Sequence, residues 1–125
     1  MTTVLLVEDD AAIREMMRRR LQLRGFTVLE AADGPEAVAI AAGASPDTVL
    51  LDIELPGGMS GWDVVGILRG DARTKGIRVF AITAHVTPND LERARQVGCN
   101  QFFGKPVDFR ALVEALGGEP RAVQR

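Results

Sequence analysis

Short runs of apolar, β-favouring residues alternate along this chain with longer stretches of helical periodicity. The predicted strands cover residues 3–7, 26–29, 48–51, 79–82 and, more weakly, 101–103. The predicted helices cover about residues 11–24, 34–42, 61–71, 88–97 and 108–116, and Gly25 and Gly43 are the expected ends of the first two. Because helices separate the strands, right-handed crossovers and a parallel sheet are expected. The pattern therefore predicts a single α/β domain.

Composition is typical of a water-soluble globular protein. Hydrophobic residues make up 46% and charged residues 26% of the 125 positions, which is enough chain for one domain with a substantial core. The net charge of −2 provides no basic field, so nucleic acid is not an expected partner. No apolar stretch is long enough for a secretion signal or a membrane span, so we expect a cytoplasmic protein without membrane insertion. The single cysteine, Cys99, excludes an internal disulfide and is interpreted as a small, partly buried hydrophobe.

Polar residues follow four of the five predicted strands. The first strand leads into Glu8 and Asp9, the third into Asp52, the fourth into Thr83 and the fifth into Lys105. The carboxyl ends of parallel strands meet at one edge of a sheet, which is where ligands bind in open α/β folds. We therefore expect three carboxylates, a hydroxyl and an ammonium group to lie together.

Three neighbouring carboxylates call for a cation, because they would otherwise repel one another and raise one another's pKa. Mg²⁺ is the expected ion, with Mn²⁺ as a substitute, since it prefers oxygen ligands and commonly completes its coordination with a substrate phosphate. Lys105 could then pair with one phosphoryl oxygen while Thr83 donates a hydrogen bond to another. Asp52 could accept the phosphoryl group, because carboxylates act as nucleophiles in aspartyl-phosphate chemistry.

Each of these residues also has a simpler interpretation. Glu8, Asp9 and Asp10 could cap the following helix, because acidic residues stabilise helix N-termini, and Asp10 is assigned that role. Asp52 alone could be an ordinary turn residue. The coincidence of an acid pair, an acid, a hydroxyl and a lysine at the ends of different strands favours a joint site.

The sequence resembles the receiver domains of two-component response regulators, which have the chemotaxis-regulator fold. The resemblance covers about residues 4–116 and rests on Val4-Leu5-Leu6-Val7-Glu8-Asp9-Asp10, Leu50-Leu51-Asp52-Ile53-Glu54-Leu55-Pro56, Ile82-Thr83-Ala84 and Gly104-Lys105-Pro106. It implies a doubly wound sheet in the order 2-1-3-4-5 with helices on both faces. The receiver domain is expected over residues 1–117. Residues 118–125, which carry Gly, Pro and charge without a periodic apolar face, are expected to be a flexible tail or linker stub.

The resemblance implies a role for each polar residue at the strand ends. Asp52 matches the phosphoacceptor, and Lys105 matches the family's lysine. Glu8 and Asp9 match the acidic pair that holds Mg²⁺ together with Asp52 and the backbone carbonyl of Glu54. The peptide bond from Lys105 to the following proline is expected to be cis, although few X-Pro bonds are.

Thr83 and Phe102 match the family's switch residues. Phosphorylation in receivers draws the hydroxyl toward the phosphoryl group, and an aromatic ring of the fifth strand turns inward. Phe102 has no hydroxyl and could report the switch only by packing. The resemblance implies an output surface made of the fourth helix, the fifth strand and the fifth helix. This surface would have two states, and phosphorylation would shift the population from one to the other.

Two departures from the family pattern concern the surroundings of the site. The loop that contains Gly57 and Gly58 is one residue longer than the family's usual loop. Glu54 and His85 stand two positions beyond the acceptor and the switch hydroxyl, where family members carry residues that influence phosphoryl lifetime. Their side chains could therefore affect an attacking water molecule.

The resemblance implies a phosphorylation-dependent signalling switch and not a turnover enzyme. The implied partners are a histidine kinase or histidine phosphotransfer domain, which supplies the phosphoryl group, and a downstream protein target. A phosphorylation-dependent homodimer is left open. The first helix, with Arg14, Arg18, Arg19, Arg20 and Arg24, presents either a solvated charged face or a docking surface for the kinase.

Two other functions are less well supported by the residues. Phosphohydrolases of the haloacid-dehalogenase type place their nucleophile after the first strand with a second aspartate two positions on, whereas Asp52-Ile53-Glu54 follows the third strand. A non-phosphorylated, receiver-like interaction module would be expected to lose the acid pair or the acceptor, and this chain retains both.

Overall fold

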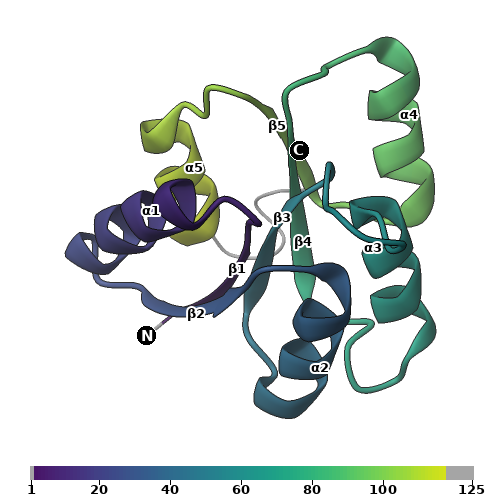
Figure 1. Cartoon of the computed structure of the whole chain (residues 1–125), viewed down its shortest axis with the longest axis horizontal. Coiled ribbons are helices and arrows are strands. Elements are labelled where there is room, and N and C mark those ends of the chain that lie inside the picture. Colours follow the sequence, from purple (N-terminus) through teal and green to yellow (C-terminus); the bar gives the residue numbers. More distant parts are fainter. Residues whose placement is uncertain (1, 118–125) are drawn as a thin grey trace.

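A five-stranded parallel sheet in the order β2-β1-β3-β4-β5 forms the centre of the computed structural model, which describes residues 2–117 (Figure 1). The strands are β1 (Thr3–Val7), β2 (Thr27–Ala31), β3 (Thr48–Asp52), β4 (Arg78–Thr83) and β5 (Gln101–Gly104). The helices are α1 (Ala11–Leu23), α2 (Gly34–Ala44), α3 (Gly61–Gly70), α4 (Pro88–Val97) and α5 (Phe109–Gly117). Figure 1 shows α1 and α5 on one side of the sheet and α2, α3 and α4 on the other. The predicted α/β fold and strand order are confirmed.

The tail expected over residues 118–125 lies outside the described residues. None of the helices between residues 2 and 117 is long and apolar enough to cross a membrane.

Each face of the sheet carries its own apolar core, because successive residues of a strand point to opposite faces. On β1, Leu5 and Val7 join the core beneath α2 and α3, whereas Val4 and Leu6 join the core beneath α1 and α5. The helices contribute Ala37, Ala41, Val64, Val65 and Leu68 to the first core and Met17, Leu21, Phe109, Leu112 and Leu116 to the second. Strands buried on both faces account for the continuous apolar runs in the sequence.

Both ends of α1 agree with the sequence predictions, whereas the end of α2 differs. Asp10 caps α1 as predicted, with its Oδ1 accepting hydrogen bonds from two backbone N–H groups at 2.9 and 3.1 Å. Gly25 takes a φ of 92° just after α1, which suits a residue without a Cβ. The expectation that α2 ends at Gly43 is wrong. The helix continues to Ala44, and Ser45 adopts the left-handed conformation (φ 48°) at its C-cap.

The strand register gathers the polar strand ends at one edge. Val7 of β1 pairs with Leu51 of β3, so the residues that follow them become neighbours. Asp52 pairs with Ile82 of β4, directly before Thr83, and Thr83 pairs with Gly104 of β5, directly before Lys105. The Lys105-Pro106 peptide bond is cis, as expected. Parallel pairing in register therefore positions the candidate site.

Candidate functional site

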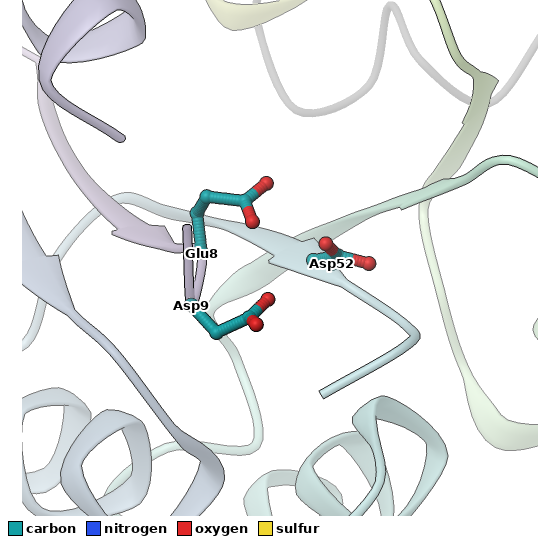
Figure 2. A group of neighbouring side chains, drawn as sticks. All are labelled: Glu8, Asp9 and Asp52. Atoms are coloured by element: carbon teal, nitrogen blue, oxygen red, sulfur yellow. The ribbon is translucent and has the colours of Figure 1, made fainter. Parts of the chain in front are cut away.

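Three carboxylates meet at the carboxyl edge of the sheet. Glu8, Asp9 and Asp52 each offer an oxygen, and these oxygens all lie within 4.8 Å of one another. Figure 2 shows the side chains of Glu8 and Asp9 extending from the end of β1 toward Asp52 at the end of β3. Glu8 and Asp52 are 6% and 4% exposed, whereas Asp9 is open to solvent. The cluster thus combines two buried acids with one that a solvated ion could reach.

Glu8 is held from several sides. Its backbone N–H donates to the carbonyl of Ala31 at 3.1 Å, and its own carbonyl accepts a hydrogen bond from Arg14 at 2.7 Å. The N–H of Asp10 donates to its carboxylate at 3.1 Å. Burial raises the pKa of Glu8, the Asp10 hydrogen bond opposes this effect, and the charge of Asp52 adds to it. The raised pKa thus reflects mainly the burial of this carboxylate, whose charged form a bound cation would stabilise.

The carboxylate of Asp52 is oriented through both oxygens. The backbone N–H of Glu54 donates to Oδ1 at 2.9 Å, and the ammonium of Lys105 donates to Oδ2 at 2.8 Å. Lys105 also lies 3.7 Å from a carboxylate oxygen of Glu8. Burial lowers the pKa of Lys105, but the hydrogen bond and charge of Asp52, with the charges of Glu8 and Glu54, outweigh it and leave the pKa raised. Lys105 is therefore a cation at neutral pH.

Thr83 is buried at the end of β4, with 2% of its surface exposed. Its hydroxyl donates to Oε2 of Glu54 and accepts a hydrogen bond of 3.1 Å from the backbone N–H of His85. The N–H of Ala84 donates to Oε1 of Glu54 at 3.4 Å. Sequence reasoning placed Glu54 at the site through its backbone carbonyl and did not predict this side-chain contact. Its position two residues beyond Asp52 was the only signal.

The longer loop after β3 still returns to the site. Gly57 takes a φ of 81°, and the chain comes back so that the N–H of Gly61 donates to the carbonyl of Ile53 at 3.0 Å. A Cβ on Gly61 would lie 2.6 Å from the Cα of Ile53 and 2.9 Å from the carbonyl oxygen of Asp52. The start of α3 can therefore pack against the end of β3 in this way only with glycine at this position.

Two further residues from the sequence predictions lie away from the acid cluster. Phe102 is half-buried on β5 and packs against the core beneath α2 and α3, and its role in switching stays a prediction. Cys99 is half-buried against the same core. Burial raises the pKa of its thiol to about 11, with partial opposition from the charge of Arg69.

The five polar side chains predicted for the strand ends lie at one edge of the sheet, and hydrogen bonds or short distances link them. Glu8, Asp9 and Asp52 form the acid cluster, and Lys105 is paired with two of its members. Thr83 is connected to the end of β3 through Glu54. This arrangement can bind a hard cation and an anion side by side, which is what phosphoryl chemistry at a carboxylate requires.

Comparison with known proteins agrees with this geometry. Residues 4–117 match the family described as the response regulator receiver domain. The polar-differentiation response regulator DivK of Brucella ovis is 32% identical over 114 residues, which span 91% of this chain and 92% of that protein.

Solved structures share both fold and sequence with this chain. The chemotaxis protein CheY4 of Vibrio cholerae superposes with a TM-score of 0.86 at 32% identity, covering 93% of this chain and 96% of that one. A putative response regulator from Chloroflexus aurantiacus has a TM-score of 0.86 at 27% identity, covering 99% and 98% of the two chains. With the matching family and the arrangement of the strand ends, these similarities show that the chain belongs to the response regulator receiver domain family.

Proposed function

We propose that this receiver domain is a signalling switch in which Asp52 accepts a phosphoryl group. The observation that carries the proposal is the fixed carboxylate of Asp52, which is hydrogen-bonded through both oxygens and lies beside two further acids. In the transfer, an oxygen of Asp52 forms a bond to phosphorus as the bond between phosphorus and the donor breaks. The donor, a phosphohistidine imidazole, leaves with the bonding electron pair. The reaction modifies the protein itself, so the domain is not a turnover enzyme.

The donor set fits Mg²⁺. Three carboxylate oxygens within 4.8 Å, one of them on an exposed side chain, match an ion that prefers oxygen ligands and keeps several waters. We assign Glu8, Asp9, Asp52 and the backbone carbonyl of Glu54 as its ligands. When bound, the ion supplies positive charge that offsets the carboxylates and the phosphoryl oxygens.

Lys105 and Thr83 stabilise the phosphoryl group in this proposal. The ammonium of Lys105, which pairs with Asp52 at 2.8 Å, can transfer its hydrogen bond to a phosphoryl oxygen. The hydroxyl of Thr83 donates to a second oxygen, and its movement vacates space that Phe102 fills. The shift of α4, β5 and α5 then alters binding of a downstream protein, with or without a homodimer, in the cytoplasm.

We propose that the phosphodonor, a histidine kinase or phosphotransfer domain, docks beside α1. A groove of about 280 Å³ opens between α1 and the segment that follows β5, and Asp52 is among its lining residues. Ile13 and Met16 line this groove and are 40% and 48% exposed, which provides apolar docking surface next to the acceptor.

The sequence left two interpretations for the arginines of α1: a solvated charged face or a docking surface for the kinase. Their contacts within the domain bear on this choice. Arg14 and Arg18 each lie 3.4 Å from the carboxylate of Glu30, and the guanidinium of Arg20 lies 4.0 Å from the ring centre of Phe109. These contacts anchor α1 to its own domain. The apolar groove and not the charge of the helix is therefore the stronger support for docking.

Incubation with acetyl phosphate and Mg²⁺, followed by intact mass measurement, tests the proposal. We expect one added phosphoryl group on the wild type. Asp52→Asn and a chelator control should show none. A folded, Mg²⁺-binding wild type that gains no mass would contradict the proposal and favour a non-phosphorylated interaction module.

A further inference from the structure

We propose that the carboxylate of Glu54 is an internal competitor of the phosphoryl group, which must be displaced before Asp52 can be stably phosphorylated. This inference rests on the proposed function and concerns how the same site is regulated. It assigns the side chain of Glu54 a role separate from that of its backbone carbonyl.

The contacts of Glu54 connect the acceptor to the neighbouring strand. Its backbone N–H donates to Oδ1 of Asp52 at 2.9 Å, so its main chain is fixed next to the nucleophile. From there its side chain reaches β4, where Oε2 accepts from the Thr83 hydroxyl and Oε1 accepts from the N–H of Ala84. The charge of the carboxylate also contributes slightly to the raised pKa of Lys105. One anionic group thus occupies two hydrogen-bond donors at the end of β4.

The same groups are those that a phosphoryl group on Asp52 would need. β3 and β4 are paired in register, so the end of β4 lies directly beside Asp52. A phosphoryl group brings three charged oxygens. Lys105 already donates to Asp52, and Thr83 and Ala84 directly follow the β4 residue that pairs with Asp52, so these three donors are the ones available to it. Because a hydroxyl or a single N–H makes one strong hydrogen bond at a time, the carboxylate and the phosphoryl oxygens compete for them.

Exposure makes displacement of Glu54 feasible. Glu54 is exposed, whereas Thr83 is buried, so the carboxylate can rotate into water and recover its hydration. The hydroxyl of Thr83 retains its second contact, the hydrogen bond from His85 at 3.1 Å, and does not have to move with Glu54. The site therefore has a closed state with Glu54 bound and an open state that receives the phosphoryl group, and the closed state reduces the apparent affinity for anions.

The test is the rate of phosphorylation by acetyl phosphate at saturating Mg²⁺, followed by intact mass. In this reaction an Asp52 oxygen bonds to phosphorus and acetate leaves with the electron pair of the broken P–O bond. Glu54→Gln keeps the size of the side chain but removes its charge, and a neutral acceptor binds the donors more weakly. We expect phosphorylation about tenfold faster than in the wild type. Glu54→Ala, which removes the acceptor, should be at least as fast.

A charge-matched control separates this effect from net charge. Glu114→Gln removes the same charge from an exposed position on α5 and should react at the wild-type rate. A second measurement avoids the chemical step: calorimetric titration with beryllofluoride in the presence of Mg²⁺ should show about tenfold tighter binding to Glu54→Gln. On a Thr83→Ala background, most of this gain should disappear, because the contested hydroxyl is absent.

The outcomes distinguish the inference from the function on which it rests. If the wild type is phosphorylated but Glu54→Gln reacts and binds beryllofluoride no better, the competitor role is wrong and the Glu54 contact is only structural. If no variant with Asp52 intact gains mass, the proposed function fails and the inference falls with it.

Discussion

Lys105 donates a hydrogen bond of 2.8 Å to Oδ2 of Asp52 across 53 residues of sequence. The same ammonium lies 3.7 Å from Glu8, so it partly neutralises two of the three clustered acids. Lys105 thus supplies part of the positive charge that Mg²⁺ would bring to these carboxylates. Lysine and the metal ion stabilise the same carboxylates, and each weakens the binding of the other.

Substitution of Lys105 should therefore strengthen Mg²⁺ binding while weakening phosphorylation. In Lys105→Met, loss of a partly solvent-screened repulsion of about 1 kcal/mol predicts about fivefold tighter Mg²⁺ binding by calorimetry. Loss of the ammonium from the phosphoryl group predicts phosphorylation about 100-fold slower. Lys75→Met is the matched control, because Lys75 is the other lysine of the chain and is exposed. It should leave the Mg²⁺ affinity and the phosphorylation rate unchanged. Weaker Mg²⁺ binding in Lys105→Met would contradict the shared charge balance.

Gly61 provides a test of how the loop after β3 supports the acceptor. In Gly61→Ala, the new Cβ would lie 2.6 Å from the Cα of Ile53 and 2.9 Å from the carbonyl oxygen of Asp52, so the backbone at the end of β3 or at the start of α3 must shift. We expect a loss of about 2 kcal/mol in the free energy of unfolding, measured in urea, together with slower phosphorylation.

Gly66→Ala is the control for that substitution. Gly66 lies within the same helix, α3, and a Cβ there meets no atom within 4 Å. The higher helix propensity of alanine should stabilise the domain by about 0.5–1 kcal/mol. Equal effects of the two substitutions would show that helix propensity and not contact with the acceptor strand determines the result.

The sequence predicts the strand ends well because burial on both faces imposes continuous apolar runs. The first strand and the fourth helix have the predicted bounds, 3–7 and 88–97. The positions of Asp52, Thr83 and Lys105 follow from the fold, since parallel strands in register bring their carboxyl ends together.

Contacts between sequence-distant side chains and main chain could not be predicted in this way. The Glu54 side chain binds donors on β4 that only the three-dimensional structure brings near. Arg78 is 8% exposed at the start of β4 and donates to Thr48 and to the carbonyl of Leu116 at the end of α5. No residue pattern marks these four partner groups, because two of them, the N–H of Ala84 and the carbonyl of Leu116, are backbone groups of a kind that almost every residue carries.

The thiol of Cys99 should be unreactive at neutral pH. Burial raises its pKa from 9.0 to about 11, so the thiolate fraction at pH 8 falls about 100-fold. Reaction with a disulfide reagent at pH 8 should be at least that much slower in the native protein than in urea. Because the folded-state pKa is raised, the stabilisation of the neutral thiol is complete below pH 9 and is lost as the pH rises toward 11. Cys99→Ala should lack this alkaline loss, and rapid native labelling at pH 8 would contradict the assignment.

Arg69 is expected to be the most destabilising arginine to remove from the α3–α4 side of the sheet. Its guanidinium donates to the carbonyls of Lys75 and Ile77 at 2.8 and 2.6 Å, to the carbonyl of Gly98 at 2.8 and 3.1 Å, and to the Asn100 side chain at 3.0 Å. These bonds join the end of α3, the loop before β4 and the loop after α4. Burial lowers the pKa of Arg69, and its electrostatic interaction with Cys99 offsets this effect only in part.

Replacing Arg69 with alanine removes the guanidinium donor from the half-buried carbonyls of Ile77 and Gly98 and should cost about 2–4 kcal/mol in the free energy of unfolding. Arg69→Lys should recover little of this, because a single ammonium cannot reproduce the planar fork that spans both loops. Arg73→Ala is the control: Arg73 is exposed and, within residues 2–117, pairs only with the nearby Asp71 at 2.8 Å, so urea denaturation should show little change. If Arg69→Lys were as stable as the wild type, charge alone and not the geometry of the guanidinium would hold the two loops together.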